Sequence, residues 1–165
     1  RTVVLLVSDH GEGQGGHRWA QKAAFYEESV HVPMMMAGPG VGQGVTNRLA
    51  SLLDILPTFC DYAGVPAPAE VRGVSLRKEV GREYVVSELR YQDASRDGRM
   101  VRSARYKYIV FRSGANAEQL FDLEQDPGEV ENLARRPEAA SELARHRRML
   151  AEWSRQTGDR FRPAS

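Results

Sequence analysis

The sequence is poor in cysteine, in excess charge of either sign and in long apolar runs. Cys60 is the one cysteine among 165 residues, so an internal disulfide is excluded. Lys and Arg total 23 and Asp and Glu total 22, and the resulting net charge of +1 provides no overall attraction to nucleic acid. No apolar run reaches the length of a membrane span. We therefore expect neither nucleic acid nor a membrane as a partner.

The first half of the sequence has the pattern of an α/β protein. Hydrophobic residues make up 41% of the chain, which is enough material for a core. Continuous apolar runs at residues 2–7 and 34–37 predict buried strands, with a short helix at 20–29 between them. Residues 49–53 predict a further short strand, which leads into a helix with Asp54 as its N-cap.

The second half has the pattern of a small antiparallel sheet with one long helix. Residues 66–82 are rich in proline, glycine and charge, which marks a crossing between two parts of the chain. Four strands are then predicted, at residues 83–89, 99–103, 106–112 and 119–123. The alternation along the third strand suits a sheet that is covered more on one face than on the other. Residues 138–156 carry a helical apolar stripe, in which we expect His146 to be a rim or core residue.

The main chemical signal lies at the end of the first predicted strand. Asp9 and His10 follow residues 2–7, and ligand sites in open α/β sheets form beyond the carboxyl ends of the strands. A carboxylate and an imidazole side by side can complete one side of a divalent-metal shell. Taken alone, such a pair more often caps a turn, with the histidine packed beneath it. The pattern around the pair therefore decides between the two interpretations.

That surrounding pattern resembles the metal-site loop of the sulfatase family, which belongs to the alkaline-phosphatase superfamily. The matching residues of the loop are Ser8, Asp9, His10, Gly11, Glu12, Gly16, His17, Trp19, Lys22, Tyr26 and Glu27. Further matches, in the order typical of the family, are Val32-Pro33, Gly38-Pro39-Gly40, Asp54 to Pro66, Tyr106-Lys107-Tyr108, Leu120 to Leu123, Asp126-Pro127-Gly128-Glu129 and Asn132-Leu133-Ala134. The likeness covers nearly the whole chain.

The resemblance implies roles for four residues. Asp9 and His10 would bind a divalent cation, usually calcium in this family, and Lys22 would contact the sulfate group. A fixed cation at Lys22 makes physical sense, because cleavage of a sulfate ester builds negative charge on oxygen. His17 matches a looser family position that could face the substrate. The alternatives are a solvated surface lysine and a plain loop histidine.

The resemblance also implies a fold and a division of the chain. We expect residues 1–75 to be the end of a larger mixed or parallel α/β sheet of the sulfatase catalytic domain. Residues 76–165 would form a C-terminal α+β subdomain, with the four-stranded antiparallel sheet packed by the C-terminal helix. Strands cut from a larger sheet expose edges and apolar faces, so we expect this piece to self-associate.

One part of the family pattern is absent. The motif C/S-x-P-x-R, whose Cys or Ser becomes the formylglycine nucleophile, does not occur, and Cys60 is followed by Asp61-Tyr62-Ala63. We therefore expect the nucleophile, and the paired Asp-Asp that supplies further metal ligands, in an N-terminal part outside this chain. The chain alone would be inactive, since a bound cation cannot replace a nucleophile.

The reaction and the substrate remain open at this point. A sulfuric ester hydrolase that acts on a sulfate-ester small molecule or a sulfated glycan is the first hypothesis. The second hypothesis is a phosphoester or phosphonate monoester hydrolase of the same superfamily, which shares the Asp-His pair. The third hypothesis is a non-catalytic binding or assembly module. Export to the periplasm or the outside of the cell is suggested by the resemblance alone.

Overall fold

The computed structural model describes residues 2–78 and 81–163, and its N-terminal part is built on two short strands. β1 (Val4–Val7) pairs antiparallel with β4 (Met34–Ala37). A small hairpin of β2 (Gly13–Gln14) and β3 (Ala20–Gln21) and the one-turn helix α1 (Glu27–Val30) lie between them in the sequence. A longer helix, α2 (Ile55–Ala63), follows.

Two expectations for this part are wrong. The helix predicted over residues 20–29 is reduced to α1, because the segment before it runs through a hairpin in which His17, Arg18 and Gln21 have positive φ. Residues 49–53 form no strand. The Ser51 side chain accepts a hydrogen bond from the Leu53 N–H, and this starts a 3-10 turn at Leu52–Asp54.

Asp54 does not cap α2 as predicted. Its carboxylate accepts hydrogen bonds from the main-chain N–H groups of Ser51 and Val74 and pairs with Arg82, and the side chain is buried. The reason is that the helix enters through a capping box, in which Ser51 is the cap and Asp54 is the residue that reaches back. Asp54 thereby ties the 3-10 turn to the segment that follows α2.

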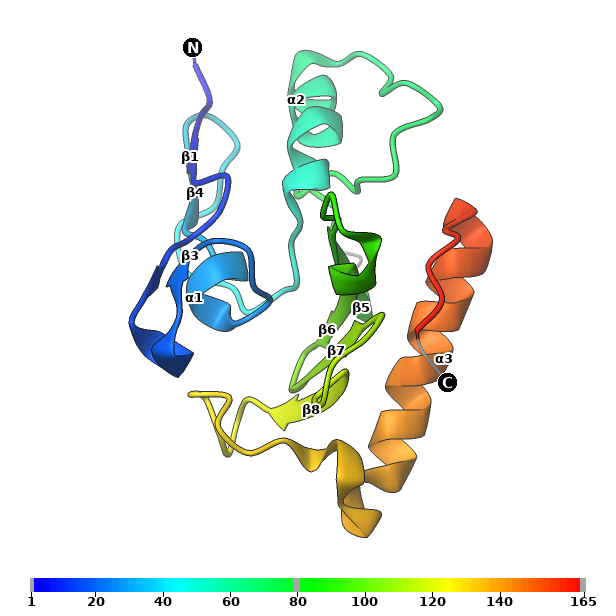
Figure 1. Cartoon of the computed structure of the whole chain (residues 1–165). Helices are drawn as coiled ribbons and strands as arrows, with labels where there is room; N and C mark the ends of the chain where they lie inside the picture. The colour runs from blue at the N-terminus through cyan, green and yellow to red at the C-terminus, as the bar shows by residue number, and fades with distance from the viewer. Residues whose placement is uncertain (1, 79–80, 164–165) are drawn as a thin grey trace.

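The C-terminal part is a four-stranded antiparallel meander, as predicted. Its strands lie side by side in sequence order, and each pairs with the next. They are β5 (Tyr84–Leu89), β6 (Gly98–Ser103), β7 (Tyr106–Phe111) and β8 (Glu118–Asp122). After short 3-10 turns the chain ends in α3 (Ala140–Thr157), which runs beside the sheet in Figure 1.

Both faces of this sheet are covered, whereas the sequence predicted more cover on one face than on the other. On one face Val101, Tyr108 and Leu120 pack against Leu143 and Leu150 of α3. On the other, Met100, Ile109 and Phe121 pack with Phe25, which precedes α1. In Figure 1 the sheet accordingly stands between α3 on one side and the N-terminal elements on the other. Of the helices in residues 2–78 and 81–163, none is both long and apolar enough to span a bilayer.

Candidate functional site

Asp9 and His10 lie directly after β1 and contact each other. The main-chain N–H of His10 donates to Oδ1 of Asp9 over 2.9 Å, and Nε2 of His10 lies 3.3 Å from Oδ2. The hydrogen bond from the His10 main chain lowers the pKa of Asp9 below its ordinary value. The Asp9 side chain is 82% exposed. It is therefore an ionised carboxylate that is open to a ligand.

A second contact assigns the proton on the His10 ring. Nδ1 lies 2.8 Å from the carbonyl oxygen of Gly11, which can only accept, so the proton is assigned to Nδ1. Nε2 of the neutral ring is then an acceptor, and Nζ of Lys22 donates to it over 2.9 Å. Two acceptor atoms, Nε2 and Oδ2 of Asp9, thus lie close together beside a cation. A carboxylate oxygen and an imidazole nitrogen are ligands that fit a divalent metal ion, and an ion at Nε2 would take the lone pair to which Lys22 donates here.

Lys22 is held next to His10 by main-chain packing. The hydroxyl of Ser29, a buried residue of α1, donates to the carbonyl oxygen of Lys22 over 2.6 Å. The N–H of Gly11 donates to the carbonyl oxygen of Ser29 over 2.8 Å. A Cβ atom on Gly11 would lie 1.9 Å from the carbonyl oxygen of Glu28, so this approach requires glycine. The loop that carries Asp9 and His10 and the segment that carries Lys22 therefore form one unit.

A buried lysine of the C-terminal sheet contacts the segment that follows Lys22 and holds it against the sheet. Lys107 in β7 is fully buried, and its ammonium donates to the carbonyl oxygen of Phe25 over 2.9 Å. The same nitrogen lies 2.7 Å from Oε1 of Glu27 and 2.8 Å from Oε1 of Glu129. Oε2 of Glu129 accepts from the main-chain N–H of Glu27 over 2.6 Å. We call Lys107, Glu27 and Glu129 the lysine triad.

The two carboxylates of the lysine triad respond differently to burial. Burial raises the pKa of Glu129 above its ordinary value, and the lysine offsets only part of this effect. Burial also opposes ionisation of Glu27, but the charge and hydrogen bond of Lys107, together with Arg102 and His31, lower its pKa overall. Two acids thus share one buried base, so removal of the base leaves the buried carboxylate of Glu129 without its cation.

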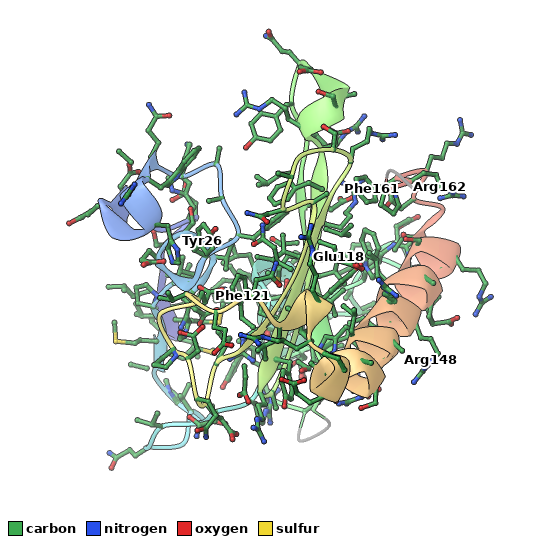
Figure 2. All side chains as sticks on the ribbon, turned by 60° about the horizontal axis from the view of Figure 1, so that its bottom comes forward. Tyr26, Glu118, Phe121, Arg148, Phe161 and Arg162 are labelled. Carbon is green, nitrogen blue, oxygen red and sulfur yellow. The ribbon has the colours of Figure 1, made fainter. Side chains whose placement is uncertain are left out.

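His17 lies apart from Asp9 and His10. Its ring stacks on Tyr26 with a centroid separation of 3.7 Å and an interplanar angle of 4°. Ligand atoms of His17, Glu28 and Glu129 also lie within 4.8 Å of one another. Figure 2 shows Tyr26 beside Phe121 of β8, and their ring centroids are 6.3 Å apart. His17 is therefore joined to the sheet through Tyr26.

Comparisons with known proteins identify the family. The family described as N-sulphoglucosamine sulphohydrolase, C-terminal, matches residues 15–156. The chain belongs to the sulfatase family. It is 41% identical over 98% of its length to a Delta 4,5-hexuronate-2-O-sulfatase of Bacteroides thetaiotaomicron, of which it covers 36%. It is 37% identical over 81% of its length to human arylsulfatase K, of which it covers 28%.

Solved structures agree with this assignment. A 2-O GAG sulfatase superimposes with a TM-score of 0.88 at 40% identity, over 95% of this chain and 37% of the other. A phosphonate monoester hydrolase of Agrobacterium radiobacter superimposes with a TM-score of 0.80 at 26% identity, over 93% of this chain and 35% of the other. The sulfatase chain described here thus spans about a third of the length of these relatives.

The geometry brings together three of the four residues singled out from the sequence of this sulfatase. Asp9, His10 and Lys22 form one contact cluster, whereas His17 belongs to the group around Tyr26. The sequence analysis missed the function of Lys107 as a link between sheet and site. A signal for it was present, because a charged residue between two tyrosines in a central strand has no solvent to face.

Proposed function

We propose that this sulfatase chain provides the cation-binding and sulfate-binding residues of a sulfuric ester hydrolase that acts on a sulfated glycan. Asp9 and His10 hold the divalent cation, calcium by family resemblance, and Lys22 binds the sulfate group. The observation that carries the proposal is the contact between Nζ of Lys22 and Nε2 of His10, 2.9 Å apart. His17, five residues before Lys22 in the sequence, is assigned to the substrate side of the same segment.

The roles of these residues follow from their charges. The bound cation supplies positive charge that stabilises the anionic oxygens of the ester. Lys22 adds a second positive charge where negative charge develops on the sulfate and the leaving oxygen. The hydrogen bond between Gly11 and Ser29 and the one between Ser29 and Lys22 keep both charges at fixed positions. The formylglycine nucleophile is assigned to a segment outside these residues, so the chain alone is inactive.

The division of the chain at residue 75 is part of the proposal. Residues 1–75 complete a catalytic α/β domain, and residues 76–165 form the subdomain that supports it. Contacts across this division are extensive, since Phe25 and Glu27 of the first part pack against β7 of the second.

A phosphonate monoester hydrolase is the second candidate. The observation that favours it is the TM-score of 0.80 to an enzyme of that name. A phosphonate ester also carries an anionic group that a cation and a lysine can bind. The two candidates differ in the ester that the complete enzyme hydrolyses faster.

Hydrolysis of 4-nitrophenyl sulfate tests the proposal. We expect no turnover by the 165-residue chain and turnover by the complete enzyme that contains it, lost after treatment with a chelator. In the complete enzyme, Lys22→Ala should lower kcat/KM about 10²–10³-fold, as the loss of an electrostatic group at a transition state does. Lys78→Ala removes an exposed lysine and is the matched control. Turnover by the chain alone, or faster hydrolysis of a phenyl phosphonate ester, would contradict the sulfatase assignment.

A further inference from the structure

A cavity lies between the segment that carries Lys22 and the C-terminal sheet. Its volume is about 410 Å³, which is within the range of sites for small ligands. Trp19, Ala23 and Ala24 form one wall, and Ala23 directly follows Lys22. The opposite wall comes from Phe111 and from the loop between β5 and β6. Two residues that follow the proposed sulfate-binding residue, Ala23 and Ala24, thus line the cavity, whereas the side chain of Lys22 points to His10 and belongs to the other cluster.

Aromatic side chains, among them Trp19 and Tyr91, line the cavity. Trp19 and Tyr91 are both half-buried, so their rings are in contact with protein on one side and are accessible on the other. The hydroxyl of Tyr91 donates to the carbonyl oxygen of Ala23 over 2.8 Å, which ties the loop to the Lys22 segment. The indole N–H of Trp19 donates to the carbonyl oxygen of Gln21. These hydrogen bonds restrict the rotation of both rings.

One positive charge stands at this cavity without a fixed acidic partner. The guanidinium of Arg96 lies 4.6 Å from the centre of the Tyr91 ring, on which it stacks. Within residues 2–78 and 81–163, Arg96 forms no ion pair with a carboxylate, although many of the other arginines do. Stacking leaves the edge of a guanidinium free, and that edge presents paired N–H donors to an anion.

The ligand that these features fit is a sugar ring with an anionic group. The C–H faces of a pyranose are apolar and pack against aromatic rings, while a carboxylate or sulfate on the ring accepts from the arginine. We propose that Trp19, Tyr91 and Arg96 form a subsite for the anionic sugar next to the one that carries the sulfate to be removed. The inference rests on the proposed function, since it places a glycan at Lys22.

Binding to the complete enzyme tests the subsite without any need for turnover. The probe is a disaccharide in which a hexuronate 2-O-sulfate is joined to a second sugar that also carries a sulfate, and calorimetry gives its Kd. We expect Arg96→Ala to raise Kd about tenfold or more, because it removes a charge-assisted hydrogen bond. Arg148→Ala is the matched control, since Arg148 is exposed on α3 and points away from the sheet in Figure 2. Its Kd should equal that of the wild type.

Three binding results would overturn the subsite. They are no measurable binding by the wild type, equal Kd values for Arg96→Ala and the wild type, and equal weakening by both arginine variants. A structure of the complete enzyme in which its own chain fills the cavity would overturn it as well. In contrast, a wild type that binds the disaccharide through Arg96 but hydrolyses no sulfate ester would contradict the proposed function and leave the subsite supported.

Turnover gives a second readout that a loss of folding cannot imitate. The ratio of kcat/KM for the disaccharide to kcat/KM for 4-nitrophenyl sulfate should fall about tenfold in Arg96→Ala, because the aryl ester has no second sugar to place in the cavity. A destabilised enzyme loses both activities together and keeps the ratio. An unchanged ratio would therefore count against the subsite.

Discussion

The paired strands β1 and β4 and the four-stranded sheet are both made of apolar antiparallel strands, but only the sheet is covered within this chain. Val4, Leu6 and Met35 on the pair are 57%, 56% and 58% exposed. Val101 and Leu120 in the sheet are fully buried under α3, and Phe25 covers the other face of the sheet. An apolar strand alone therefore does not determine its own burial. Burial depends on whether distant segments of the chain pack against it.

The lysine triad is where the two regions meet. Lys107 belongs to the covered sheet, and its partners Phe25 and Glu27 belong to the segment that carries Lys22. The well-packed region therefore acts as the support for the segment that bears the proposed site. Changes at this junction should have larger effects than changes within either region.

Removal of Lys107 from the lysine triad is expected to lower the stability of the chain more than any other change considered below. Lys107→Met keeps the volume of the side chain but leaves the buried carboxylate of Glu129 without a cation and removes the nearest cation of the half-buried Glu27. We expect a loss of about 3–5 kcal/mol in the free energy of unfolding, the usual cost of breaking a buried ion pair. Urea denaturation measures it.

Two further variants show whether charge is the cause. Lys107→Met combined with Glu129→Gln should recover part of the loss, because the buried carboxylate that lost its cation is then replaced by a neutral amide. Arg136→Met removes an arginine whose side chain is 54% exposed and which pairs with Glu131, whose side chain is 59% exposed, and it should cost less than about 1 kcal/mol. Equal losses in Lys107→Met and Arg136→Met would contradict the role of the triad.

A smaller effect is expected at the covering helix. His146 of α3 is fully buried, and Nε2 lies 3.0 Å from the hydroxyl of Ser103 in β6. His146→Phe removes this contact, although the hydroxyl keeps its hydrogen bonds with the main chain of Tyr106, and should cost about 1–3 kcal/mol. Thermal or urea unfolding at neutral pH measures the change.

The same histidine makes the stability of the sheet depend on pH. Burial lowers the pKa of His146 in the folded chain, although the main chain and carboxylate of Glu142 oppose this effect. The unfolded chain therefore binds more protons than the folded chain just below the ordinary value of 6.5. Stability should fall as pH decreases below that value.

A variant assigns this dependence to one residue. His146→Phe should flatten the decrease, because the buried imidazole is then absent. The free energy of unfolding is followed from pH 7.5 to pH 5.5, above the range of most carboxylates. If the slope is unchanged in His146→Phe, another group is responsible.

The smallest change in stability is expected on the exposed face. Leu6 and Met35 are opposite each other in the β1–β4 pair. Replacing both with threonine, which suits a strand, should alter the free energy of unfolding by no more than about 0.5 kcal/mol. We nevertheless expect self-association of the chain to decrease, because the apolar face is what recruits a second copy.

Light scattering of the chain at high concentration measures this association. Val130→Thr is the control, since Val130 is 83% exposed but lies outside the strand pair. A wild-type chain that stays monomeric and binds no hydrophobic dye would contradict the prediction.

Local patterns in the sequence predicted the structural elements that are determined by residues close together in the chain. The four strands of the sheet, α3 and the burial of His146 follow from periodicity, and all are present. The helix over residues 20–29 failed because the side chain of Phe25, buried against the distant sheet, outweighs local helix propensity. Asp54 was assigned as a cap because the capping pattern was started three residues too late, at Asp54 rather than Ser51.

The sequence predicted only those residues of the candidate site that lie close together along the chain. Asp9, His10 and Lys22 stand within fourteen positions and match a family pattern. The contacts of Lys107 with Phe25 and Glu27, and the cavity with Arg96, join segments about 70–80 residues apart. Such contacts depend on how the sheet packs, which no short pattern encodes.

The hydrogen bond between Glu27 and Glu129 joins residues 102 positions apart, and this has a consequence for synthesis on the ribosome. Chains are made from the N-terminus at about 5–20 residues per second, so Glu129 is added roughly 5–20 s after Glu27. During that interval the segment with Lys22 has neither Lys107 nor Glu129 to hold it. The proposed sulfate-binding residue therefore reaches its final position only after nearly all of this chain has been translated.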